Sequence, residues 1–148
     1  MCTAVLMLSG CSMLGLGKFK WIEWTSSGEK YYLLKNCFLA AGNSLSPRQS
    51  FDHNMYENVS FCFVPANEKN HYVSKTLWYD PSGLEFRAIR QTHDKQQETK
   101  RGSERTPQGT TRIHSLPLKE LYEHKRGLWK VELYLDDVLA RRLPFTVH

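Results

Sequence analysis

This sequence lacks several motifs typical of enzymes and the long apolar segment typical of a membrane-spanning protein. No apolar run reaches the length of about eighteen residues that a transmembrane helix needs. The chain has no G-x-S-x-G nucleophile motif, no phosphate-binding G-x-x-x-x-G-K-[ST] loop, no H-E-x-x-H pair and no C-x-x-C pair. We therefore expect no enzymatic activity, no cofactor and no metal site.

What is present is enough apolar material for a folded domain. The chain has 148 residues, of which 41% are hydrophobic and 12% aromatic, so wholesale disorder is excluded and one domain is expected. The formal net charge is +5, which suits an anionic partner without selecting one.

The first seventeen residues differ from the rest because they carry no charge. Within them, Leu8, Ser9, Gly10 and Cys11 resemble the lipobox of bacterial lipoproteins. The resemblance implies cleavage before Cys11, a diacylglycerol on its thiol and a second acylation on its amine, which together anchor a protein stably to a membrane. Ser12, as a residue other than aspartate after that cysteine, implies the outer membrane facing the periplasm. The alternative is a short buried strand followed by a free Cys11 thiol.

The remainder of the chain reads as short, aromatic-rich strands separated by turns, a pattern typical of an all-β sandwich of about seven strands. The stretch from Gly127 to Tyr134 and the ending from Phe145 to Val147 resemble the last two strands of bacterial immunoglobulin-like domains. Trp78 stands where such sandwiches place a buried tryptophan. The expected organisation is a signal peptide over residues 1–10, an anchor and tether over 11–29, and an immunoglobulin-like antiparallel β-sandwich over 30–148.

Two cysteines remain in the expected mature domain, Cys37 and Cys62. An even pair in an exported protein favours a disulfide, which would close a loop of roughly 25 residues and stabilise the fold by about 3–4 kcal/mol. The alternative is a pair of buried thiols that act as small hydrophobic side chains.

The segment from 92 to 111 has no large apolar residue and reads as a solvated hairpin tip. Its cations are candidates for electrostatic contact with an anionic envelope polymer or an envelope protein; they are Lys95, Lys100, Arg101 and Arg105. The function expected is that of a lipid-anchored, non-enzymatic binding or assembly module with no nucleic-acid partner. The alternative is a periplasm-facing enzyme or enzyme inhibitor that uses the loops 41–58 and 90–112.

Overall fold

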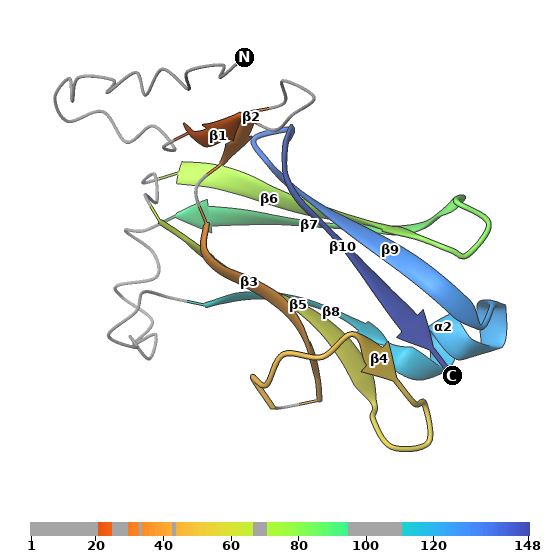
Figure 1. The fold of residues 1–148 in the computed structure, drawn as a ribbon. Helices are drawn as coiled ribbons and strands as arrows, with labels where there is room; N and C mark the ends of the chain where they lie inside the picture. The colour runs from red at the N-terminus through yellow and green to blue at the C-terminus, as the bar shows by residue number, and fades with distance from the viewer. Residues whose placement is uncertain (1–20, 25–29, 33, 43, 67–70, 95–110) are drawn as a thin grey trace, which may run out of the picture.

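The structure is a computed structural model, and it describes residues 21–24, 30–32, 34–42, 44–66, 71–94 and 111–148 (Figure 1). Within these residues two β-sheets face each other. The smaller sheet has the strand order β3 (Leu34–Ala41), β5 (Asn58–Pro65), β8 (Arg112–Pro117). The larger sheet has the order β4 (Ser50–Phe51), β10 (Val138–Val147), β9 (Gly127–Leu135), β6 (His71–Tyr79), β7 (Glu85–Asp94).

The predicted all-β sandwich is confirmed. Among the described residues, seven strands of the two sheets have six or more residues, and β4 adds a two-residue edge. All pairs within the two sheets are antiparallel except β4, which runs parallel to β10. A further antiparallel hairpin joins β1 (Trp21–Trp24) to β2 (Lys30–Tyr32), and β2 contacts β10.

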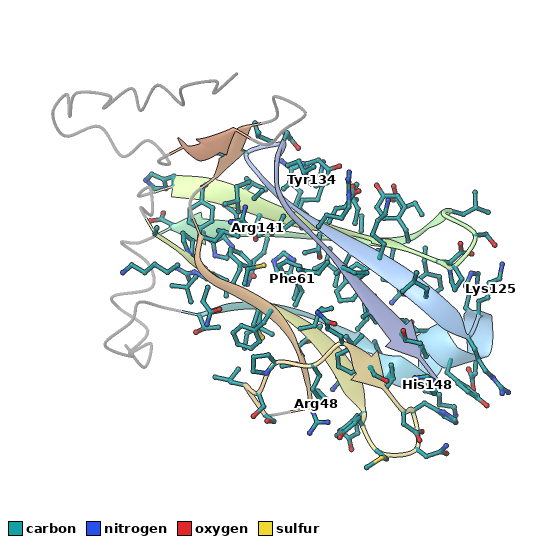
Figure 2. All side chains as sticks on the ribbon, viewed as in Figure 1. Arg48, Phe61, Lys125, Tyr134, Arg141 and His148 are labelled. Carbon is teal, nitrogen blue, oxygen red and sulfur yellow. The ribbon has the colours of Figure 1, made fainter. Side chains whose placement is uncertain are left out.

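The core fills the space between the two sheets. Alternation along each strand places one set of side chains inward, as in β9, where Trp129, Val131, Leu133 and Leu135 are all fully buried. Phe145 packs against Trp129 and edge-on against Trp78, which is buried as the sequence predicted. In Figure 2, Phe61 of β5 lies between the two layers.

Two local features follow directly from the sequence. Residues Leu118–His124 form the helix α2, whose buried Leu118 and Leu121 close one end of the core beside the C-terminus (Figure 1). Asp136 and Asp137 both have positive φ, at 48° and 64°, and form the tight turn between β9 and β10. Short polar side chains tolerate that left-handed conformation, which matches the twist of the flanking strands.

Candidate functional site

The first candidate site is a chain of polar side chains inside the core. Ser74 Oγ lies 2.7 Å from Nε2 of His93 and 2.9 Å from Nε2 of His114. The other ring nitrogen of His114, Nδ1, lies 2.9 Å from Oγ1 of Thr76, which accepts a hydrogen bond from the indole N–H of Trp78. Strands β6, β7 and β8 contribute these residues, so the network links the two sheets.

The network is compatible with two neutral imidazoles. The Ser74 hydroxyl carries a single proton, so it donates to one ring and accepts an N–H from the other. Desolvation, and to a smaller extent the positive charge that His93 can carry, lower the pKa of His114 to about 4. Both rings are also enclosed by aromatic side chains, with Tyr72 stacked on His93 and Phe63 edge-on to His93 and His114.

A serine hydroxyl next to an imidazole is the pairing that activates a nucleophile in hydrolases. Here the pairing is sealed, because Ser74 is 0% exposed and each histidine is 2% exposed. A substrate cannot reach the hydroxyl without opening the sandwich. The arrangement therefore stabilises and positions the two sheets in the folded state.

The second candidate site lies on the opposite, outward side of the five-stranded sheet. Because the odd-numbered residues of β9 enter the core, Lys130, Glu132 and Tyr134 point outward. Glu132 nevertheless has only 3% of its surface exposed, since longer side chains cover it. Its Oε1 accepts from Arg142 Nε at 2.7 Å and pairs with Lys130 Nζ at 3.2 Å, and its Oε2 accepts from the Tyr134 hydroxyl at 2.8 Å.

The strand register extends this cluster into a lattice. Arg90, Lys75 and Tyr134 stand opposite one another on β7, β6 and β9, and the next two rows hold Glu132 beside Arg142 and Tyr79 beside Lys130. We call this surface the basic face; its members are Lys75, Tyr79, Arg90, Lys130, Glu132, Tyr134 and Arg142. In Figure 2 the labelled Tyr134 lies near the β9–β10 turn.

Ring contacts hold the lysines of the basic face in place. The ammonium of Lys130 lies 4.2 Å from the ring centre of Tyr79, and that of Lys75 lies 5.1 Å from the ring centre of Tyr134. Lys75 also pairs with Asp137 at 3.0 Å. These cation–π and ionic contacts restrict the lysine rotamers and so reduce the entropy that binding an anion would cost.

The buried carboxylate organises the charges around it. Burial raises the pKa of Glu132, but hydrogen bonds from Tyr134, Arg142 and Lys130 outweigh burial and leave that pKa below its usual value. Burial and then the hydrogen bond to Glu132 raise the pKa of Tyr134, so its phenol stays protonated. The basic face therefore holds a permanent negative charge at its centre and exposed cations around it.

The structure keeps the two predicted disulfide partners apart as free thiols. Cys37 stands opposite Phe63 on the neighbouring strand, and Cys62 stands opposite Phe38. Because successive residues of a strand point to opposite faces, Cys37 points toward the core and Cys62 points away from it. The expected Cys37–Cys62 bridge is therefore not formed, and this corrects the sequence-based prediction. Burial raises the pKa of Cys37 to about 12 and that of Cys62 to about 11.

Other predicted site residues lie outside the described part of the chain. These are the lipid-attachment residue Cys11 and the electrostatic candidates Lys95, Lys100, Arg101 and Arg105. The segment 41–58 is described except at residue 43. It lines part of two hollows, a groove of about 560 Å³ between β3 and β10 and a pocket of about 510 Å³ beside α2.

The basic face was not foreseen from the sequence. Alternation in the stretch 128–135 does place Lys130, Glu132 and Tyr134 on one side of a strand, which was the available signal. The residues of the basic face on β6, β7 and β10 lie beside them only because of strand register, which a local sequence pattern does not predict.

The described residues offer no candidate metal site and no candidate membrane-spanning helix. No group of three or more His, Cys, Asp or Glu residues could hold a metal ion in the described ranges. No helix among the described elements is long and apolar enough to cross a membrane.

Comparisons with known proteins give a likeness in structure. No family model and no curated protein matches the chain. An immunoglobulin-like protein from Pseudomonas aeruginosa, solved by crystallography, is similar in fold with a TM-score of 0.47 and 10% sequence identity. The match covers 76% of this chain and 92% of that chain.

Proposed function

We propose that this protein is a lipid-anchored, non-enzymatic envelope lipoprotein that acts as a binding or assembly module. The observation that carries the proposal is a contrast in exposure. Among the described residues, Ser74 and its two histidine partners are sealed in the core, whereas the cations of the basic face reach solvent. A side chain that binds a partner must reach solvent. The cations of the basic face do so, and they are suited to binding an anionic partner.

The anchor part of the proposal rests on the lipobox-like residues that end at Cys11. Acyl chains on this cysteine would hold the domain at a membrane, with residues 11–29 as the anchor and tether, within which residues 21–24 form strand β1. Ser12 supports sorting to the outer membrane, where the sandwich would face the periplasm. The partners would be an envelope protein or an anionic envelope polymer.

Metabolic labelling with a palmitate analogue in a Gram-negative host tests the anchor. The wild-type chain should incorporate label and fractionate with membranes, whereas Cys11→Ala should be unlabelled and either soluble or unprocessed. Cys62→Ala is the matched control, because it removes a buried thiol and should keep the label. A soluble, unlabelled wild-type protein that retains residues 1–10 would contradict the proposal.

A further inference from the structure

We propose that the basic face binds a linear sugar chain that carries carboxylate groups. The residues concerned lie on four neighbouring strands of one sheet, and four of them are cations, namely Lys75, Arg90, Lys130 and Arg142. Neighbouring strands are about 4.8 Å apart, so the cations form a broad array across the sheet.

The charge balance of the basic face favours an anionic ligand. Two of the four cations are directed at the central carboxylate of Glu132, and Lys75 pairs with the exposed Asp137 at the edge. Arg90 is exposed and lies close enough to Asp137 to influence the pKa of that carboxyl. Glu85, opposite Tyr79 on β7, is a third carboxylate near this surface, so four cations against three carboxylates leave a net positive charge.

The contacts within the basic face also indicate that it is preorganised. The Glu132 carboxylate contacts both Arg142 and Lys130. The ring of Tyr79 contacts the Lys130 ammonium, and the ring of Tyr134 contacts the Lys75 ammonium. Half of the Arg142 side chain and 40% of the Lys130 side chain remain exposed. A ligand would therefore meet cations already held in position, which lowers the entropy lost on binding.

The basic face presents less exposed apolar surface than protein and lipid partners need. Protein interfaces are centred on buried aromatic or aliphatic side chains, and interfacial membrane binding also buries apolar groups. Leu77 stands beside Glu132 on this face but is only partly exposed. Among the described residues of β9, the large exposed hydrophobic side chain is Leu128, near the strand's start and away from Tyr134 at the other end. A hydrated polyanion is therefore the better occupant.

The distribution of the cations favours carboxylates spaced along a chain. A phosphate is best bound where several donors converge on one point, as at a helix N-terminus or an arginine cluster. Here the cations form two separate pairs: Lys130 and Arg142 meet at Glu132, whereas Lys75 stands opposite Arg90. Two such pairs suit carboxylates that are spaced along a chain. This choice of a sugar chain over nucleic acid, which is also a polyanion, rests on the proposed envelope location.

The test measures binding of the purified full chain to polygalacturonate at low salt, with neutral dextran, poly-glutamate and a single-stranded oligonucleotide as comparators. We expect binding to polygalacturonate that weakens as salt rises, no binding to dextran and weaker binding to the other two polyanions. The inference is overturned if polygalacturonate does not bind, or if poly-glutamate or the oligonucleotide binds as tightly.

Paired variants locate the site. Lys75→Gln/Arg90→Gln removes two cations that do not contact Glu132, and should weaken polygalacturonate binding about tenfold or more. The matched control, Lys35→Gln/Lys119→Gln, removes two positive charges from β3 and α2, away from the basic face. It should bind polygalacturonate as the wild type does. Equal losses in the two variants, or none in the first, would overturn the assignment, and urea unfolding checks that both are folded.

Three further outcomes separate this inference from the others. Replacing Lys95, Lys100, Arg101 and Arg105 by Gln tests the segment 92–111. If this variant loses binding while Lys75→Gln/Arg90→Gln retains it, the inference is overturned in favour of that segment. Failure of polygalacturonate binding in a chain that is labelled at Cys11 refutes the inference and leaves the proposed anchor intact. Binding through the basic face in a chain that is not labelled refutes the anchor and supports the sugar-binding surface.

Discussion

We expect the buried histidine network to lower the stability of the fold in acid. Replacing His114 tests how large that loss of stability is. Its pKa is lowered to about 4 in the folded state, against 6.5 for an ordinary histidine. Below pH 6.5 the unfolded chain takes up a proton at this residue that the folded protein refuses until about pH 4. The stability linked to His114 is therefore complete above pH 6.5 and is lost as the pH falls towards 4.

The size of the effect follows from the pKa difference. One pKa unit corresponds to about 1.4 kcal/mol, so His114 should lower the free energy of unfolding by about 2 kcal/mol between pH 6.5 and 5, and by about 3 kcal/mol by pH 4. For a chain of this length, a loss of about 3 kcal/mol corresponds to a decrease in Tm of roughly 10 °C.

Urea unfolding of wild type and His114→Gln at several pH values provides the assay, with tryptophan fluorescence as the probe, since Trp78 and Trp129 are buried. Glutamine cannot titrate in this range, and its amide can replace one hydrogen bond of the ring. The variant should be less stable than wild type at pH 7, and the difference should shrink by about 2 kcal/mol at pH 5.

A matched control uses a histidine on the surface. The His71 side chain is 66% exposed and lies 3.4 Å from Asp94, a pairing that solvent screens, so His71→Gln should change the pH dependence far less than His114→Gln does. If the stability difference between wild type and His114→Gln is the same at pH 7 and pH 5, His114 does not carry the acid sensitivity and the reasoning is refuted.

Three other predictions concern single side chains. Trp129→Ala should reduce the free energy of unfolding by about 3–5 kcal/mol, because a fully buried aromatic ring is removed; a loss below 1 kcal/mol in urea unfolding would contradict this. Cys37 and Cys62 should resist alkylation in the native protein and both react in denaturant without a reductant, as mass spectrometry would report; labelling that requires reductant would show a disulfide. Glu132→Gln should bring the pKa of Tyr134 closer to its ordinary value by removing the carboxylate that accepts a hydrogen bond from the phenol, and ultraviolet absorbance titration should detect this; an unchanged titration curve would contradict it.

The fold class could be predicted from the chain because its cause is local. Alternation in the stretches now seen as β6, β8 and β9 is a period-two signal that each strand carries in its own residues. The turn at Asp136 and Asp137 was readable for the same reason, since short polar side chains suit positive φ.

The disulfide prediction failed for a reason that separation along the chain cannot reveal. Cysteine count and spacing indicate whether a loop could close, but a bridge also needs two side chains on the same side of a sheet. In the register of β3 and β5, Cys37 stands opposite Phe63, one residue away from Cys62. The two thiols therefore point to opposite faces of the sheet.

Local sequence thus specified the strands, the turns and the hydrophobic side of alternating strands such as β6, β8 and β9, because these depend on neighbours within a few residues. It did not specify that side for β5, which is buried throughout, or for β7, whose burial does not alternate. Register and sheet order specified the rest. They bring His93 of β7 and His114 of β8 to one hydroxyl on β6, and they place cations from four strands around Glu132. Such contacts join residues that are far apart along the chain, and they form only when the two sheets pack and each strand selects its neighbours.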